Sequence, residues 1–432
     1  MIQKPQSPSE VLNQATAIHC SFAITGKYSK ETVQSHWNQL MKNYPYCVDY
    51  EWAGGIFEKE NKIIEITIEN QHPKTIQHAI RIVLEECHYY AYDTRSFGKE
   101  KSSLLIFSTI EIENKEYTIF GMYQCHSRTD FKSVIYFMED FLNYFDETFD
   151  ISSSQVIPMG SCFSQILEQN CIPSKERSIE IKQQTPKNIL TYDFTHIKGE
   201  EPHWRESHHE HHLRSAGSIT LSQEEIKTFI KWCKSHNFST QAVFWAIQLK
   251  TYEKLFERKS KNADTVVLMS PFDCRNVLGI HDPIIGMYID VIYPMFPVSF
   301  IDLSIEEMAK QLTDYIRSVN TFNSKELDRY RDFIYNGHFE SIDIPNTAFF
   351  SNVAGMKVMN RLTNPMKEKF VDFLISSFPR NNHDEAVTPT IYSWGLYNGI
   401  SIITVFYNGI VEHDLIDRIL IEMKNMVLSL SQ

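Results

Sequence analysis

Hydrophobic and polar positions follow two different periods along this chain. Runs dense in β-branched and aromatic residues predict strands, whereas apolar residues spaced three or four apart predict helices with one buried face. In the N-terminal third the predicted strands are 17–24, 47–52, 62–69, 104–111 and 116–124. Helices are predicted to include Val33, Ile76 and Val134. The last two strands form a predicted hairpin that turns at Asn114 and Lys115 and leads directly to His126.

The C-terminal part resumes this pattern after a polar, irregular stretch. Strands are predicted at 218–221, 265–269, 390–397 and 400–407. Ser222 and Glu225 fit a capping box at the start of a helix. Asn398-Gly399 is the strongest short hairpin signal in the chain, because this dipeptide suits a two-residue turn between strands. The pattern closes with a helix over 415–427.

Composition bounds the class of protein. The chain has 432 residues, 42% hydrophobic and 13% aromatic, which suffices for two or three domains or one large two-lobed unit. A net charge of -12 without a basic stripe disfavours a nucleic-acid partner, since phosphate binding needs clustered Lys and Arg. No apolar run approaches the roughly 20 residues of a membrane-spanning helix. The first ten residues lack the build of a signal peptide, so we expect a cytoplasmic protein.

Neither the cysteines nor the histidines predict a metal site. The cysteines show no CxxC spacing and no repeated interval, which also argues against a disulfide framework. They are Cys20, Cys47, Cys87, Cys125, Cys162, Cys171, Cys233 and Cys274. A cluster of histidines could bind a metal only if a helix held it, and nothing caps one there, so a solvated linker is favoured. These histidines are His203, His208, His209, His211 and His212.

The candidate chemistry lies at 125–130, CHSRTD, a polar segment between a predicted strand and a predicted helix. A histidine held at the end of a buried strand can serve as a general base near neutral pH. His126 can equally be a partly buried histidine bonded to backbone, which is the more common state of a lone histidine. Cys125 is disfavoured as a nucleophile paired with His126, because neighbours on a strand point to opposite faces. A Ser-His-Asp hydrolase is disfavoured because no GxSxG elbow occurs.

The segment HSRTD, His126 to Asp130, resembles the HxxxD motif of the acyl-thioester-dependent acyltransferase superfamily. That superfamily joins chloramphenicol acetyltransferase, plant alcohol acyltransferases, polyketide-associated acyltransferases and the condensation domains of nonribosomal peptide synthetases. The order of further segments agrees with it. The strand at 265–269 leads into SPFDCR, whose Arg275 matches the arginine that pairs with the motif aspartate. The resemblance implies that Asp130 and Arg275 support the loop and do not touch substrate.

Three more residues are implied as site candidates. The segment 347–355 is similar to the family's strand ending in SN-x-G, so that Ser351 and Asn352 would hydrogen-bond the acceptor or the oxyanion. Trp394 lies in YSWG, about where the plant enzymes carry DFGWG. Because the aspartate and the first glycine are absent, Trp394 is expected first as a packing residue and second as a site residue.

The resemblance also implies the architecture, an α/β fold of two chloramphenicol-acetyltransferase-like lobes. Each lobe would have a mixed sheet with helices, and the two would form a V with the active site at their interface. The N-terminal lobe would span 1–182, a polar His-rich crossover linker 183–214 and the C-terminal lobe 215–432. Part of 350–400 would cross back to the N-terminal lobe.

The implied function is transfer of an acyl group from a CoA or carrier-protein thioester to an alcohol or amine, in secondary metabolism. His126 would act as the general base without an acyl-enzyme. The acyl-CoA or phosphopantetheine-linked acyl group would be a co-substrate, with no permanently bound cofactor and no metal. An acyl or peptidyl carrier protein is a possible partner in this scheme, and a monomer suffices because both lobes share one cleft.

The sequence departs from the family pattern at three places. Phe131 replaces the glycine that commonly ends the motif, Cys125 stands where condensation domains carry a second histidine, and Met287 replaces a frequent asparagine. Two alternatives therefore stay open. One is a free-standing condensation enzyme that forms an amide from carrier-bound acyl groups, and the other is a catalytically inactive binding relative.

Overall fold

The computed structural model describes most of the chain and divides it into two compact units. The described residues are 16–44, 51–52, 55–56, 63–92, 103–126, 129–150, 158, 186, 188–194, 196–200, 215–275, 280, 283–319, 347–352, 360–379, 390–396, 399–406 and 413–430. The first unit comprises Met1–Gln169, His281–Met287 and Val358–Asn381. The second comprises Asn170–Ile280, Tyr288–Lys357 and Asn382–Gln432. Two segments from the later half of the chain thus belong to the first unit.

The first unit is built on a five-stranded mixed sheet of order β14-β1-β6-β5-β4. Its strands are β1 (Thr16–Thr25), β4 (Ile64–Glu65), β5 (Ser103–Ile112), β6 (Lys115–Cys125) and β14 (Phe370–Pro379). Only β4 and β5 pair in parallel, and every other pair is antiparallel. The late strand β14 completes the edge beside β1. The strand β6 therefore lies in the middle of the sheet, hydrogen-bonded on both sides.

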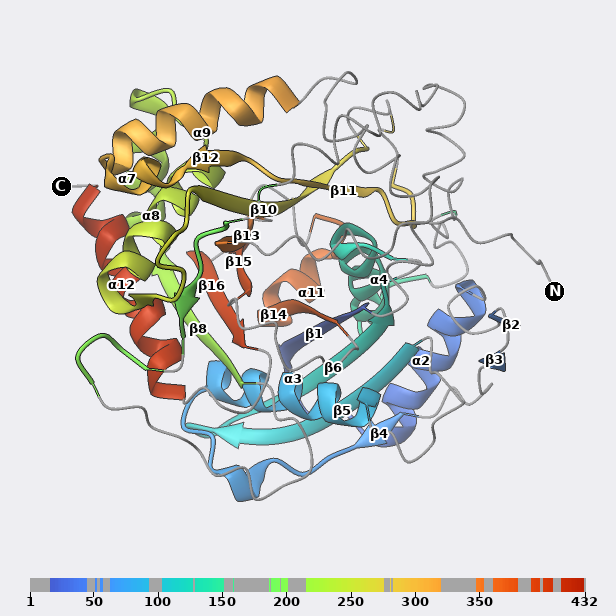
Figure 1. Cartoon of the computed structure of the whole chain (residues 1–432). Coiled ribbons are helices and arrows are strands. Elements are labelled where there is room, and N and C mark those ends of the chain that lie inside the picture. Colours follow the sequence, from blue (N-terminus) through green and yellow to red (C-terminus); the bar gives the residue numbers. More distant parts are fainter. Residues whose placement is uncertain are drawn as a thin grey trace. The chain divides into compact units, whose positions relative to one another are not determined.

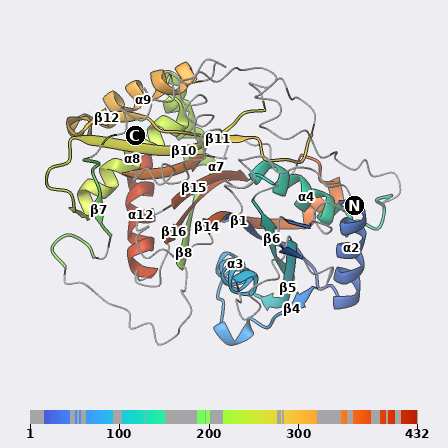
Figure 2. The same cartoon turned by 45° about the vertical axis from the view of Figure 1, so that its right-hand side comes forward.

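Helices cover both faces of this sheet (Figure 2). The helices are α2 (Lys30–Asn43), η3 (Glu69–Gln71), α3 (Ile76–Tyr92), α4 (Phe131–Asn143) and α11 (Asn364–Lys369), and a small pair of strands, β2 (Glu51–Trp52) and β3 (Gly55–Ile56), lies apart from the sheet. Successive side chains of β6 point to opposite faces of the sheet. Phe120 packs its ring 5.3 Å from Phe141 of α4, whereas Gly121 faces Val83 and Cys87 of α3.

The second unit holds a seven-stranded mixed sheet whose main path is β11-β10-β13-β15-β16-β8, with β12 also paired to β10. Its strands are β8 (Ser215–Ser222), β10 (Thr265–Asp273), β11 (Ile289–Ile292), β12 (Met295–Pro297), β13 (Ala348–Asn352), β15 (Thr390–Leu396) and β16 (Gly399–Phe406). A separate pair joins β7 (Tyr192–Asp193) to β9 (Glu257–Arg258). The strands β10, β13 and β15 run parallel, and the remaining neighbours are antiparallel.

Helices pack beside this second sheet and bury a continuous apolar core (Figure 1). They are α7 (Gln223–Ser235), α8 (Thr240–Leu255), η6 (Val298–Asp302), α9 (Ile305–Val319) and α12 (His413–Leu430). The predicted capping box at α7 is confirmed, because the Ser222 hydroxyl accepts from the Glu225 N–H while the Glu225 carboxylate accepts from the Ser222 N–H. The predicted α/β class, with a mixed sheet and helices in each unit, is confirmed.

Two local predictions need correction. The first hairpin turns at Glu113 and Asn114, one residue earlier than expected, because Ile112 pairs with Lys115. Both turn residues have positive φ, 53° and 60°, as a two-residue type I′ turn requires. The strand expected at 62–69 is only Ile64–Glu65, an edge strand that pairs on one side alone. Most of the strand expected at 47–52 lies outside the described residues.

The segment expected as a linker, 183–214, is described only in part. Its residues near 190 are part of the second unit. The Leu190 N–H donates to the Thr265 carbonyl at 2.8 Å, and β7 pairs with β9. Across the described ranges, no helix is both long and apolar enough to cross a membrane.

Candidate active site

His126 directly follows the last residue of β6, at the end of the central strand of the first unit's sheet. Its side chain is 7% exposed, and Nδ1 lies 2.7 Å from the backbone carbonyl oxygen of Thr129. A carbonyl oxygen only accepts hydrogen bonds, so Nδ1 must carry the proton. In the neutral ring the basic lone pair is therefore on Nε2. The loop thus fixes both the ring and the tautomer that a general base needs.

Burial lowers the pKa of His126 below its ordinary value of 6.5. The hydrogen bond to Thr129 and the Asp130 carboxylate act in the opposite direction but are the smaller effects. The imidazole is accordingly neutral at pH 7, with Nε2 free to take a proton.

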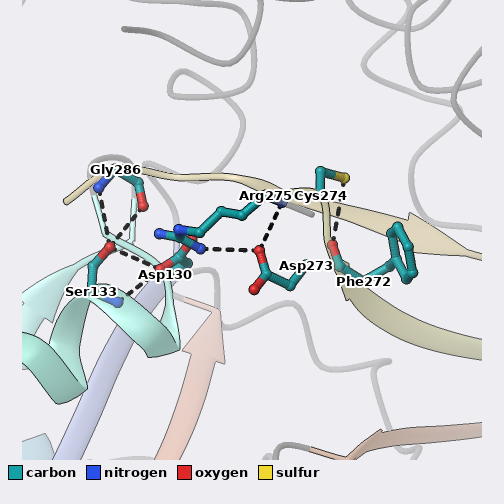
Figure 3. Close-up of polar contacts among 7 residues, drawn as sticks. All are labelled: Asp130, Ser133, Phe272, Asp273, Cys274, Arg275 and Gly286. Carbon is teal, nitrogen blue, oxygen red and sulfur yellow. Dashed lines mark hydrogen bonds and ion pairs between the residues drawn. The ribbon is translucent and has the colours of Figure 1, made fainter. Parts of the chain in front are cut away.

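Asp130 is the N-cap residue that directly precedes α4. It is almost completely buried, with 1% of its surface exposed. Its carboxylate Oδ1 accepts from the Ser133 N–H at 2.9 Å, the usual N-cap bond to the third residue of a helix. The Ser133 hydroxyl lies 2.8 Å from the same oxygen (Figure 3). Asp130 therefore holds the end of the His126 loop to the first turn of α4.

Ser133 extends this network to a segment from the later half of the chain. Its hydroxyl lies 2.9 Å from the Gly286 carbonyl and accepts from the Gly286 N–H at 3.1 Å (Figure 3). One hydroxyl proton is thus shared between Asp130 and the Gly286 carbonyl. The neighbouring Ile285 N–H donates to the Pro158 carbonyl at 3.0 Å. Ser133 and Gly286 were not singled out from the sequence, because their contact joins positions 153 residues apart.

Phe131, where the superfamily commonly has glycine, is the first residue of α4. Helical dihedrals are open to every L-residue, so this backbone does not require glycine. The motif residues Ser127 and Arg128 lie outside the described residues. The substitution at 131 is therefore compatible with the observed path from Asp130 into the helix.

Arg275 lies in the second unit, just after β10, and is 2% exposed. Its backbone N–H donates to Asp273 Oδ1 at 3.0 Å, and its guanidinium reaches the same oxygen at 3.2 Å (Figure 3). The guanidinium also lies over the Tyr288 ring, 4.8 Å from its centroid. These contacts of Asp273 and Tyr288 were not foreseen from the sequence. Asp130 belongs to the other unit, so its pairing with Arg275 stays a prediction.

Ser351 and Asn352 close β13 in the second unit. The Asn352 amide donates to Thr240 Oγ1 at 3.0 Å, at the start of α8. Alternation along the strand places Ser351 on the opposite face from Asn352. Ser351 is 3% exposed. Of the two candidates, Asn352 already has a partner on the helix side, which leaves Ser351 the better hydrogen-bond donor for a ligand.

Gln241 of α8 holds this end of β13 in place. Its amide nitrogen donates to the Phe350 carbonyl at 3.0 Å, and its amide oxygen accepts from the Asn352 N–H at 3.1 Å. The Gln241 side chain therefore forms, at the end of β13, the hydrogen bonds that the backbone of a neighbouring strand would otherwise form. Trp394 lies in β15, paired with Ser401 of β16, and its side chain is outside the described part of the chain.

No group of three or more His, Cys, Asp or Glu residues that could hold a metal occurs within the described ranges. The histidine-rich run at 203–212 lies outside them. The thiols of Cys20, Cys87, Cys233 and Cys274 are buried and form no disulfide within the described part of the chain. Burial raises the pKa of Cys20 and Cys87, which makes these thiols unreactive small hydrophobic groups.

Solved structures with the same fold come from acyltransferases and condensation domains. Trichothecene 15-O-acetyltransferase from Fusarium sporotrichioides is similar with a TM-score of 0.66 at 10% identity, over 99% of this chain and 94% of that one. Polyketide synthase associated protein 5 from Mycobacterium tuberculosis has a TM-score of 0.62 at 13% identity, over 99% of each chain. The first condensation domain of the calcium-dependent antibiotic synthetase has a TM-score of 0.62 at 10% identity, over 99% and 96%.

The chain has the fold shared by this acetyltransferase, this polyketide synthase associated protein and this condensation domain. The resemblance read from its motifs is thereby confirmed at the level of the fold. No protein-family model matches the sequence, and no curated protein matches it. At identities of 9 to 13%, the similar structures show that the architecture is shared. The chemistry has to be argued from the residues of this chain.

Proposed function

We propose that this protein is an acyltransferase that moves an acyl group from a CoA or carrier-protein thioester to a hydroxyl or amine acceptor. The observation that carries the proposal is the tautomer of His126, whose protonated Nδ1 is bound to the Thr129 carbonyl and whose basic Nε2 is left for the acceptor. The fold supports the proposal, because acetyltransferases and condensation domains share it. The setting would be secondary metabolism.

In the proposed reaction, His126 Nε2 removes the proton from the acceptor O–H or N–H while that oxygen or nitrogen attacks the thioester carbonyl carbon. The carbonyl π electrons move to oxygen and form a tetrahedral oxyanion, which a hydrogen-bond donor must stabilise. When the oxyanion collapses, the C–S bond breaks and the imidazolium returns its proton to the leaving thiolate. The ester or amide and the free thiol are the products, and no acyl-enzyme forms.

Asp130, Ser133 and Arg275 are positioning residues in this scheme. Asp130 and Ser133 anchor the His126 loop to α4 and to Gly286, which keeps the imidazole at one angle. Arg275 would add a charge partner for Asp130. Ser351 is the proposed donor to the acceptor or to the oxyanion, with Asn352 as the support of its strand.

A second candidate is a free-standing condensation enzyme that takes its acyl group from a carrier protein and forms an amide. Similar structures include the condensation domain of the polyketide synthase MokA, with a TM-score of 0.60 at 9% identity. CoA and carrier proteins present the same phosphopantetheine arm, so the chemistry at His126 would be common to both. A preference for carrier-bound donors and amines would favour this candidate.

The deciding experiment incubates the pure protein with acyl-CoA or acyl-carrier-protein donors and a panel of alcohols and amines. Release of free thiol and the mass of the product are measured. We expect turnover by the wild type and none by His126→Ala or His126→Asn. The Asn side chain can still donate to the Thr129 carbonyl but has no basic nitrogen, so its failure would assign the loss to the missing base.

His78→Asn, on α3, is the matched control and should behave as the wild type. Full turnover in both His126 variants would refute the proposed role of the base. Donor binding without turnover in the wild type would identify the chain as an inactive binding relative.

A further inference from the structure

Gln124 is a buried side chain with one unsatisfied end. It lies in β6, two residues before His126, and is 2% exposed. Its amide oxygen accepts a hydrogen bond from the Ser103 hydroxyl of β5 at 3.0 Å. Its amide nitrogen is buried and has no hydrogen-bond partner among the residues that the structure describes. Both N–H groups of this amide are therefore unsatisfied among the described residues.

The local structure holds this amide in a fixed position. The Gln124 backbone pairs with Ile18 of β1 on one side and with Ser103 of β5 on the other. The Ser103 hydroxyl occupies the amide oxygen, so the nitrogen points away from β5's hydroxyl. A buried N–H donor without a partner costs about 1–3 kcal/mol, and a leucine or methionine at this position would avoid that cost. What distinguishes Gln124 from other buried polar groups without a partner is its place two residues before the proposed base.

Gln124 lies close to the proposed base His126. A substrate bound at His126 is therefore the candidate partner of the Gln124 amide. Gln124 is the penultimate residue of β6 and His126 directly follows the strand, so the two positions lie about 7 Å apart along an extended chain. A nucleophile bound to His126 lies about 3 Å from Nε2, and the carbonyl that it attacks lies about 3–3.5 Å farther on. The reacting carbonyl would thus lie up to about 6–6.5 Å from Nε2, a distance that the side chain of a residue two positions away can cover.

We propose that the Gln124 amide nitrogen donates a hydrogen bond to the carbonyl oxygen of the acyl-thioester co-substrate. The inference rests on the proposed acyltransferase function and adds a donor substrate contact to it. A carbonyl oxygen accepts hydrogen bonds and gains negative charge as the nucleophile attacks, so a neutral N–H donor in a buried site stabilises it. The rigid strand that presents His126 would then present both the base and the donor.

Gln124→Leu and Gln124→Glu test this contact, with Ser21→Ala as the matched control. Leu removes the unpaired donor, and Glu keeps an oxygen for Ser103 but replaces the nitrogen with a second oxygen. Ser21 lies on the neighbouring strand β1, is fully buried, and its hydroxyl likewise has no partner among the described residues. Each variant is measured for thiol release with the donor that the wild type uses, for binding of a non-reactive ketone analogue of that donor that keeps the carbonyl and replaces the sulfur with a methylene group, and for thermal unfolding.

We expect Gln124→Leu to lower kcat/KM by about 100-fold, the usual effect of losing one oxyanion donor. Without ligand it should unfold at or near the wild-type temperature, because removal of the buried unpaired donor offsets loss of the hydrogen bond from the Ser103 hydroxyl. Gln124→Glu should lose activity at neutral pH, and its activity relative to the wild type at the same pH should rise at acid pH, where a protonated carboxyl can donate. Ser21→Ala should also keep or raise the unfolding temperature, with unchanged kinetics.

Two outcomes would overturn the inference and leave the proposed function intact. One is normal turnover by Gln124→Leu while His126→Ala is inactive. The other is a Gln124→Leu protein that unfolds below the wild-type temperature, which would make the amide structural. A wild type that neither turns over nor binds any thioester would overturn the proposed function itself, and the inference with it.

Discussion

His126 Nδ1 and the Thr129 backbone carbonyl oxygen lie 2.7 Å apart within one short loop. This contact orients the imidazole and directs its basic lone pair to Nε2. The loop ends at Asp130, whose carboxylate caps α4. The histidine whose tautomer is fixed and the residue that caps the helix thus lie within five consecutive positions, 126–130.

The first prediction concerns the pH dependence of turnover. Burial lowers the pKa of His126 below 6.5, and the neutral ring is the active form of a base. Activity should therefore be constant through neutral pH and fall only as the pH drops below 6.5. The measurement is kcat/KM between pH 5 and 8. An acid limb centred at or above 6.5 would contradict the role of this buried imidazole.

The second prediction concerns the cap of α4. Asp130→Ala removes the acceptor for the Ser133 N–H and should lower the free energy of unfolding by about 0.5–2 kcal/mol. Asp130→Asn keeps an amide oxygen at the cap and should retain most of that stability. Urea unfolding of the two variants provides the comparison. Equal losses in both would show that the carboxylate's charge, and not its capping bond, is what matters.

The third prediction addresses the expected pair of Asp130 and Arg275. A double-mutant cycle with Asp130→Asn and Arg275→Met measures their coupling while the cap of α4 is preserved. A direct pair between a carboxylate and a guanidinium should give a coupling free energy above about 1 kcal/mol. Additivity within about 0.5 kcal/mol, read from urea unfolding, would separate the two residues.

The fourth prediction concerns Asp372, a buried carboxyl on β14. Burial raises the pKa of Asp372 to about 6, although the Phe373 N–H and the Gln77 side chain act against that rise. Between pH 4 and 6 the folded protein holds more protons than the unfolded chain, so stability falls as the pH rises. The contribution is complete below the unfolded pKa near 3.8 and lost above 6, about 3 kcal/mol in all.

Asp372→Asn should remove this dependence and be more stable than the wild type at pH 7, with little difference at pH 4. Urea unfolding at both pH values measures it. Asp314→Asn, on the exposed side of α9, is the control and should follow the wild type. A wild-type stability that does not change between pH 4 and 7 would refute the raised pKa.

The fifth prediction concerns Gly121, where α3 approaches β6 closely. A methyl group here would lie 2.8 Å from Ile106 Cγ1 and 2.9 Å from Cys87 Cβ. Gly121→Ala should therefore lower the free energy of unfolding by about 1–3 kcal/mol, because α3 must move away from the sheet. Thermal or urea unfolding would show it, and a change below about 0.5 kcal/mol would mean that the helix shifts freely.

The sequence by itself determined the local elements of this protein. The 3.6-residue period predicted α2, α3, α4 and α12, and alternating or continuous apolar runs predicted β1, β5, β6 and β10. The capping box at Ser222 was visible, and so was the hairpin of β15 and β16, although Gly399, which was expected in its turn, begins β16 and pairs with Leu396. These features depend on residues close in the chain, so short segments contain the information. The position of His126 between a strand and a helix could be predicted for the same reason.

Only the tertiary structure decided the contacts between distant segments. Two of these contacts are the pairing of β14 with β1 and the hydrogen bond between Ser133 and Gly286. The unpaired amide of Gln124 likewise depends on which distant residues surround it. Even the basic nitrogen of His126 was not readable from HSRTD, since it follows from where the Thr129 carbonyl points. Packing and backbone direction set these relationships, and neither is encoded in the identity of any single residue.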